Sequence, residues 1–185
     1  GVQSNARWGL RGNAHSVPTD CPQRDERMGF TGDGHIAGRA LQYNFDAARF
    51  HDKWTRDHLD TQSRHGYVPA KCPNGALPEL ADPSWTVSLL AIPWHRYRFT
   101  GDASLLRRHY DRLRRYVEFW ESVAVDDLLP EEYAGYGDWV ALENTDGRWG
   151  EPTDFFTNAY YHRSVALLAD IAAVIGADAD AARYR

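Results

Sequence analysis

Long helical patterns, joined by alternately short and long connections, constrain the fold of this chain more than any other feature. The clearest pattern follows Asp102, a predicted helix cap, and its apolar residues share one helix face: Leu105, Leu106, Tyr110, Leu113, Tyr116, Val117 and Trp120. Similar spacing predicts further helices over residues 2–14, 35–62, 82–100 and 157–175, and from 178 onward. No segment alternates convincingly as a strand would. The sequence therefore predicts an all-α fold.

The connections between these helices differ greatly in length. A short turn at Thr100–Gly101 joins two helices, whereas residues 15–34, 63–82 and 126–156 form long loops rich in glycine, proline and polar residues. Helix pairs that carry every long loop at one end form an α/α toroid, whose active site lies on the loop-bearing face. We therefore expect the functional residues in the three long loops.

Composition and charge exclude several classes of function. A net charge of −5 argues against binding to nucleic acid or to anionic membranes. The most apolar stretch, residues 87–93, is far too short to span a membrane, and no signal-peptide pattern is visible. The compartment stays open between the cytoplasm and secretion. The aromatic content of 13% is high, and Trp8, Trp85, Trp139 and Trp149 lie in or beside loops, where their rings suit stacking on sugars.

Cysteine and histidine give little indication of a redox or metal site. Cys21 and Cys72 each precede a proline, and a disulfide between them can be neither deduced nor excluded. The eight histidines have no metal-ligand spacing, and only His65 lies in a polar loop where a functional role is worth considering. The sequence therefore indicates neither a metal nor a cofactor.

The segment Asp20–Asp33 (DCPQRDERMGFTGD) carries the strongest chemical signal. It holds four carboxylates and two arginines without helical or strand periodicity. Crowded carboxylates repel one another, and a nearby arginine lets some stay ionised while another keeps its proton. A glycosidase needs such a pair, one carboxylic acid that protonates a leaving oxygen and one carboxylate with a different role.

Residues 16–33 (SVPTDCPQRDERMGFTGD) resemble the signature of bacterial α-L-rhamnosidases of glycoside hydrolase family 78, the inverting (α/α)6-barrel type. The similarity extends over most of the chain, through Asn13, Trp85, and the segments 92–94 (IPW), 100–102 (TGD), 137–139 (GDW) and 158–161 (NAYY). It implies that residues 1–185 are the N-terminal part, about the first half, of an (α/α)6 catalytic barrel. The usual upstream β-domains and the later barrel are not in this sequence.

The resemblance also implies roles for individual residues. Glu26 would be the general acid, Asp20 and Asp33 would bind sugar hydroxyls, and Arg24 would bridge carboxylate and sugar. Trp85 and Trp139 would shape the pocket against the apolar face of the 6-deoxy sugar, with Asp138 a weaker candidate. Phe30 stands where the family usually has Trp, which keeps the apolar wall but loses an indole donor.

The implied function is removal of terminal α-L-rhamnose from a rhamnose-containing glycoside or oligosaccharide, with inversion, in bacterial carbohydrate catabolism. Inversion needs a second carboxylate roughly 6.5–9.5 Å from the acid, to activate water on the opposite face of the sugar. In this family that base lies in the later part of the barrel, beyond residue 185. No cofactor is implied.

The residues alone leave simpler interpretations open. Glu26 would serve equally as a structural ion-pair partner of Arg24 or Arg27, Asp20 as a turn residue, and Asp33 as the cap of a helix that starts at His35. The arginines between 107 and 115 fit a solvated helix face better than a nucleic-acid site. The whole chain would then be a non-catalytic helical fragment or sugar-binding module, completed by the missing half-barrel or by a homodimer, or a toroid glycosidase for another sugar.

Overall fold

A computed structural model of the chain describes residues 1–73, 82–139 and 152–185, and within these ranges the structure is helical. Only three isolated β-bridges occur among the described residues. No helix in the described ranges is long and apolar enough to cross a membrane. The elements are α1 (Val2–Asn13), α2 (Thr31–Asn44), α3 (Ala48–Thr61), α4 (Pro83–Thr86), α5 (Ser88–Thr100), α6 (Ser104–Val123), a 3₁₀ turn (Glu131–Tyr133), α7 (Thr153–Ile175) and α8 (Asp178–Arg183).

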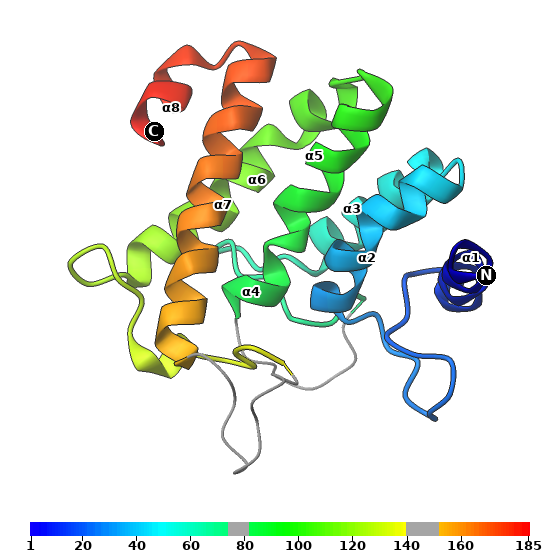
Figure 1. The fold of residues 1–185 in the computed structure, drawn as a ribbon. Coiled ribbons are helices and arrows are strands. Elements are labelled where there is room, and N and C mark those ends of the chain that lie inside the picture. Colours follow the sequence, from blue (N-terminus) through cyan, green and yellow to red (C-terminus); the bar gives the residue numbers. More distant parts are fainter. Residues whose placement is uncertain (74–81, 140–151) are drawn as a thin grey trace.

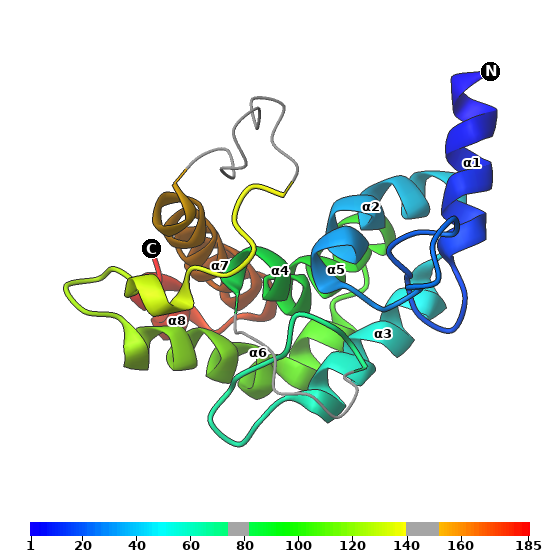
Figure 2. The same cartoon turned by 90° about the horizontal axis from the view of Figure 1, so that it is seen from below.

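The helices form two curved layers, as expected for an arc of an α/α toroid. Helices α2, α5 and α7 lie side by side in one layer, while α3 and α6 form the second layer behind them (Figures 1 and 2). Helices α2, α4 and α7 begin at the same end of the molecule, where the long loops also gather (Figure 1). The predicted all-α fold is therefore confirmed, and its loop-bearing face is the face that positions the site.

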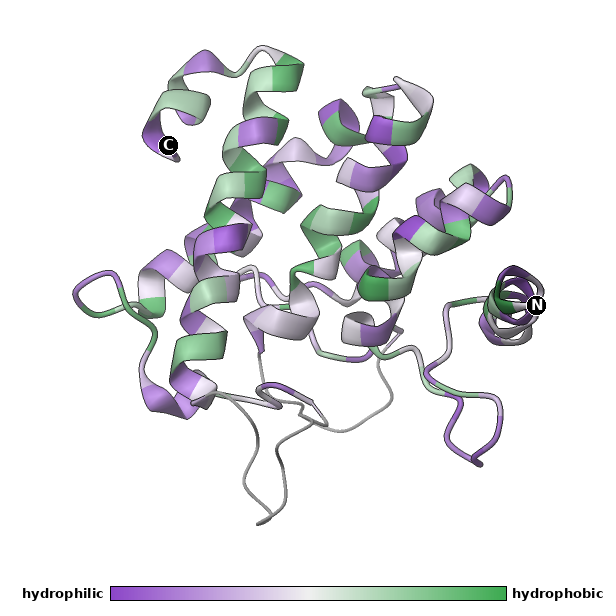
Figure 3. Cartoon of the chain, in the orientation of Figure 1, coloured by the Kyte–Doolittle hydropathy of each residue, from purple (hydrophilic) through white to green (hydrophobic). Residues whose placement is uncertain are grey.

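The core lies between the two layers. The apolar stripe predicted for the helix after Asp102 is confirmed, because its seven members are the buried residues of α6. Helix α5 is buried from Ser88 to Pro93 because other helices contact it on several sides, and its hydrophobic residues concentrate in this first half (Figure 3). Burial of these apolar side chains supplies the main driving force that joins the two layers.

Two expected helices are each divided in the structure. Residues 35–62 were predicted as one helix, but α2 ends at Asn44 and α3 begins at Ala48, with Phe45 in an extended conformation between them. Neither glycine nor proline marks this break, and the Asn44 side chain instead donates to the Ala40 carbonyl at the end of α2. The helix predicted over residues 82–100 is divided at Val87 into the single turn α4 and the longer α5.

Several helix starts also differ from the sequence prediction. Helix α2 starts at Thr31, so Asp33 lies in its first turn and the predicted cap at Asp33 is wrong. Asp82 is confirmed as the cap of α4, because its side chain accepts from the Ser84 amide. Helix α7 starts at Thr153 and ends at Ile175, and it is capped by Gly176, whose φ of 83° lies in the left-handed region that glycine adopts readily.

The aromatic and cysteine predictions have mixed outcomes. Trp120 is a core residue as predicted, whereas Trp94 is only partly buried. Trp8 lies on α1 rather than in a loop and is largely exposed. Both cysteines are free and buried, so the disulfide left open by the sequence is absent. Trp149 lies outside the described residues.

The glycines of α2 let two tryptophans pack directly on the helix backbone. A Cβ atom at Gly34 would lie 2.1 Å from the Trp54 ring, and one at Gly32 would lie 2.7 Å from the Trp85 ring. Trp54 is completely buried, and its indole N–H donates to the Cys72 carbonyl at 3.0 Å. Glycine normally weakens a helix interior, so its use here reflects the close approach of these rings.

Buried histidines reinforce the same region. The Nδ1 of His58 lies 2.7 Å from the Trp54 carbonyl and its Nε2 lies 2.7 Å from the Ser88 hydroxyl, so a neutral ring donates to the first and accepts from the second. Burial lowers the pKa of His58 to about 4, and burial likewise lowers the pKa of His35 and of His51 to about 4. These side chains are neutral at physiological pH and serve the packing.

Replacing Gly34 with Ala is expected to destabilise the purified protein by about 1–3 kcal/mol, because the added methyl group overpacks against the buried Trp54 ring. A Gly9→Ala variant is the matched control, since Gly9 lies within α1 and nothing is within 4 Å of its Cβ position. The measurement is urea denaturation. Equal stability of the two variants would contradict the packing argument.

Acidification from pH 6.5 to 4 is expected to lower the free energy of unfolding. In this pH range His35, His51 and His58 become protonated in the unfolded chain but stay neutral in the folded protein, so protons favour unfolding. Each histidine contributes a slope of up to about 1.4 kcal/mol per pH unit in this window. Urea denaturation across the pH series measures the slope. A His58→Asn variant removes one of these histidines, so its free energy of unfolding should fall less steeply with acidification, by the contribution of one bound proton. An unchanged slope would disprove the assignment.

Candidate functional site

The loop before α2 is closed by Asp20 and Met28. The Asp20 amide donates to the Met28 carbonyl at 3.0 Å, and the Met28 amide donates to Oδ1 of the Asp20 carboxylate at 2.8 Å. Beyond this closure, Thr31 donates through both its amide and its hydroxyl to the Ala70 carbonyl. Residues 21–27 are thus held as a closed loop directly before the first turn of α2.

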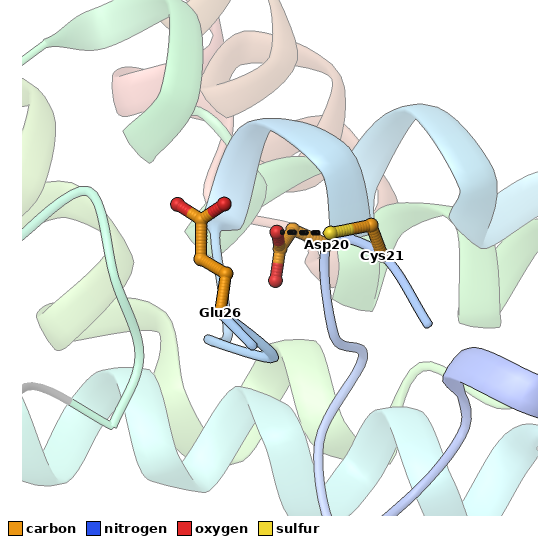
Figure 4. A group of neighbouring side chains, drawn as sticks. All are labelled: Asp20, Cys21 and Glu26. Carbon is orange, nitrogen blue, oxygen red and sulfur yellow. Dashed lines mark hydrogen bonds between the residues drawn. The ribbon is translucent and has the colours of Figure 1, made fainter. Parts of the chain in front are cut away.

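Asp20, Arg24 and Glu26 form a charged cluster in this loop. Nη2 of Arg24 lies 2.7 Å from the Glu26 carboxylate and 3.5 Å from Oδ2 of Asp20. The Cys21 thiol donates to the same Oδ2 at 2.9 Å, as Figure 4 shows, and Nε of Arg24 donates to the Cys21 sulfur at 3.2 Å. The ion pair of Glu26 with Arg24, an alternative that the sequence left open, is therefore present, whereas Arg27 instead faces Asp25.

The two nearby aspartates differ in their proton affinity. Burial alone would raise the pKa of Asp20, but hydrogen bonds from the Cys21 thiol and the Met28 amide outweigh burial and hold it below its usual value. The pKa of Asp33 is raised, first by limited hydration and then by repulsion from Asp20 and Glu26. Neighbouring carboxylates with opposite shifts are typical of acid–base and sugar-binding sites.

A cavity of about 440 Å³ opens at the end of the molecule where α2, α4 and α7 begin. Its volume is in the range of small-molecule sites. Among the residues singled out from the sequence, it brings together Asp20, Asp33, Trp85, Asp138 and Trp139 in its lining. Glu26, Arg24 and Phe30 are not in the lining. Further lining residues come from α1, α2 and α7, among them Leu10, Asn13, Ile36, Phe156 and Tyr160.

An aromatic wall made of Phe30, Trp85, Tyr136 and Trp139 lies at the site, and of these four residues Trp85 and Trp139 line the cavity, whereas Tyr136 and Phe30 lie outside its lining. The Tyr136 ring is central, with its centroid 4.8 Å from that of Trp85, 5.9 Å from Trp139 and 6.4 Å from Phe30. Trp85 is 9% exposed, whereas Trp139 is 53% exposed and is the accessible member of the wall. Phe30 contacts the other rings only through Tyr136 among the ring pairs given above. The Lys71 ammonium lies over the Phe30 ring, 4.9 Å from its centroid.

Sequence reasoning missed Tyr136 and the buried polar groups behind the wall. Tyr136 lies between Gly135 and Gly137, a turn signal that marked the loop without identifying the ring. His35 approaches the Ser84 carbonyl with Nε2 at 3.0 Å and so joins α2 to α4. Burial raises the pKa of the fully enclosed Asp82, although its hydrogen bonds from Ser84 and Tyr136 act in the opposite direction. The sequence identified Asp82 only as a helix cap.

Two other predicted features stand apart from this site. His65 is exposed, and its ring accepts a hydrogen bond from Nε of Arg64 at 2.9 Å. Within the described ranges, metal-ligand atoms of three residues come within 4.8 Å of one another in one group, Asp20, Cys21 and Glu26. The Arg24 guanidinium contacts both carboxylates of this group and offsets part of their charge.

Comparison with known proteins agrees with this architecture. The family model for the bacterial α-L-rhamnosidase six-hairpin glycosidase domain matches residues 1–185. An α-L-rhamnosidase of Formosa agariphila is 32% identical over 185 residues, which are 99% of this chain and 20% of that protein.

Solved structures give the same result. An α-L-rhamnosidase of Dictyoglumus thermophilum superimposes with a TM-score of 0.87 at 33% identity, over 97% of this chain and 20% of that one. The α-L-rhamnosidase of Streptomyces avermitilis, solved in complex with L-rhamnose, has a TM-score of 0.86 at 32% identity, over 99% and 17% of the respective chains. The chain thus spans about a fifth of the length of these relatives.

Replacing Asp20 with Ala is expected to loosen the loop 21–27, because the Met28 amide loses its carboxylate acceptor. A net hydrogen bond contributes about 0.5–1.5 kcal/mol, so amide exchange at Met28 should accelerate by roughly tenfold. Hydrogen exchange with mass spectrometry measures the change. Asp25→Ala, in the same loop with a fully exposed side chain, serves as control, and equal exchange in both variants would contradict the closure described above.

Proposed function

The chain belongs to the bacterial α-L-rhamnosidase six-hairpin glycosidase family, and from this premise we propose that the full-length protein hydrolyses terminal α-L-rhamnose from rhamnosides. Residues 1–185 would form the N-terminal part of its (α/α)6 catalytic barrel. The observation that carries the proposal is the cavity at the loop-bearing end of the helices, where Asp20 and Asp33 face the same space as Trp85 and Trp139. Carboxylates beside flat aromatic rings suit the hydroxyls and the C–H face of a sugar.

In the proposed complex the sugar ring occupies this cavity. The carboxylates of Asp20 and Asp33 would accept hydrogen bonds from its hydroxyls, because a sugar hydroxyl donates well to a carboxylate oxygen. The half-exposed ring of Trp139 and the more buried ring of Trp85 would pack on the apolar face and on the 6-methyl group. Phe30 would act indirectly, through its edge contact with Tyr136.

Glu26 is the proposed general acid. It lies outside the cavity lining, within the same charged cluster as Asp20, so it would meet the glycosidic oxygen at the border of the cavity. A general acid must come within hydrogen-bond reach of the oxygen that it protonates, and catalytic contacts often tighten only when substrate binds. The Arg24 guanidinium lies 2.7 Å from the Glu26 carboxylate. When substrate binds, Arg24 would also donate a hydrogen bond to the sugar or to its leaving group.

The proposed reaction is a single displacement with inversion. The departing oxygen takes its proton from Glu26 as the bond to the anomeric carbon breaks, and a water molecule attacks the opposite face. A second carboxylate, roughly 6.5–9.5 Å from Glu26, would remove a proton from that water. This base would come from the remainder of the catalytic barrel.

Glu26→Gln in the full-length protein is expected to lower kcat/KM for an alkyl α-L-rhamnoside by about 10²–10⁴-fold, because the poor leaving group requires protonation. The loss should be much smaller for a 2,4-dinitrophenyl α-L-rhamnoside, whose leaving group departs as a stable anion. Steady-state kinetics on the two substrates measures the difference.

The matched control is Asp25→Asn, which removes a neighbouring carboxylate whose side chain is fully exposed and should leave both rates unchanged. The anomer released first, followed by proton NMR, reports inversion or retention. Near-normal turnover of both substrates by the Glu26→Gln variant would rule out Glu26 as the acid. Faster hydrolysis of another glycoside than of rhamnosides would rule out the proposed substrate.

A further inference from the structure

Asp82 carries a carboxylate with no exposed surface, and three hydrogen bonds converge on it. Its Oδ1 accepts from the Ser84 amide at 2.8 Å and from the Ser84 hydroxyl at 2.5 Å. Its Oδ2 accepts from the Tyr136 amide at 2.7 Å. A buried carboxylate is costly unless its oxygens are satisfied, and here both oxygens are used.

These contacts join the two segments that build the aromatic wall. Ser84 precedes Trp85 in the single turn α4, and Tyr136 precedes the cavity-lining residues Gly137 to Trp139 by one residue. Asp82 and Tyr136 are 54 residues apart in sequence, yet the Asp82 side chain holds both segments. The position of the Trp85 and Tyr136 rings relative to each other therefore depends on Asp82.

The local geometry requires a carboxylate rather than a neutral isostere. An Asn at this position has one acceptor oxygen, so its NH₂ group would face either the Ser84 donors or the Tyr136 amide. The backbone also approaches Asp82 closely from the other side, because a Cβ at Gly135 would lie 2.5 Å from Oδ2. Even a small change at either residue should therefore displace the wall.

We propose that Asp82 is a positioning residue that sets the aromatic wall for sugar binding, an inference that rests on the proposed function of the cavity. Asp82 is absent from the cavity lining, so it acts through Trp85, Tyr136 and Trp139 rather than on the substrate. Helix α2 supports the same arrangement, since the Trp85 ring packs against Gly32 and His35 contacts the Ser84 carbonyl.

The test is Asp82→Asn in the full-length protein, assayed with an aryl α-L-rhamnoside. Because a small misplacement of binding groups costs up to a hundredfold, KM should rise on the order of tenfold to a hundredfold. The value of kcat should change much less, since the proposed acid Glu26 lies in a different loop. Near-UV circular dichroism should also change, because Trp85, Tyr136 and Trp139 lie within ring–ring contact.

Asp102→Asn is a closely matched control. Asp102 likewise accepts from the amide and the hydroxyl of the serine two residues later, both at 2.9 Å, but at the start of α6 and outside the cavity lining. This variant should lower thermal stability without raising KM. Gly135→Ala is an independent second variant, which crowds Asp82 without altering its charge and should reproduce the rise in KM.

The outcomes separate the two proposals. A wild-type KM in both Asp82→Asn and Gly135→Ala, with melting temperatures lowered as in Asp102→Asn, would make Asp82 a purely structural cap and overturn the inference. Absence of rhamnoside hydrolysis by the wild-type protein would instead overturn the proposed function. The near-UV spectra of the variants would still decide whether Asp82 positions the wall.

Discussion

The close contact of two tryptophan rings with the backbone of α2 is the constraint on which the rest of the structure depends. Gly32 and Gly34 leave no side chain between α2 and the rings of Trp85 and Trp54. One contact brings α4 against the start of α2, and the other fixes α3 behind it. Since the cavity opens where these helices begin, its walls take their positions from the same packing. Any group bulkier than hydrogen at these positions would force the layers apart.

The charged loop combines a structural role with the proposed chemical one. Asp20 closes the loop through the Met28 amide and also faces the cavity, so the structural and the functional interpretations are compatible for this residue. Arg24 balances Asp20 and Glu26, while Asp33 in the first turn of α2 experiences their repulsion. This distribution places carboxylates of different proton affinity around one space, which a glycosidase site requires.

The boundaries of the helices were harder to predict than their existence. The stripe of α6 and the cap at Asp82 were evident because apolar spacing and capping chemistry are local. The break at Phe45 was not, because apolar residues continue at helical spacing across it and no glycine or proline interrupts the pattern between Asn44 and Ala48. Tyr136 was missed for a related reason, since its central place in the wall arises from contacts with residues far away in sequence.

By itself, the sequence determined the all-α class and the family, and it identified segment 20–33 as the candidate for the chemistry, because these depend on periodicity and on residue identity along a short stretch. Only the tertiary structure decided that Asp20, Asp33, Trp85 and Trp139 share one cavity, that Glu26 pairs with the same arginine as Asp20, and that Asp82 joins two distant segments. Those arrangements result from the packing of α2, α4 and α7 against one another, which no local pattern encodes.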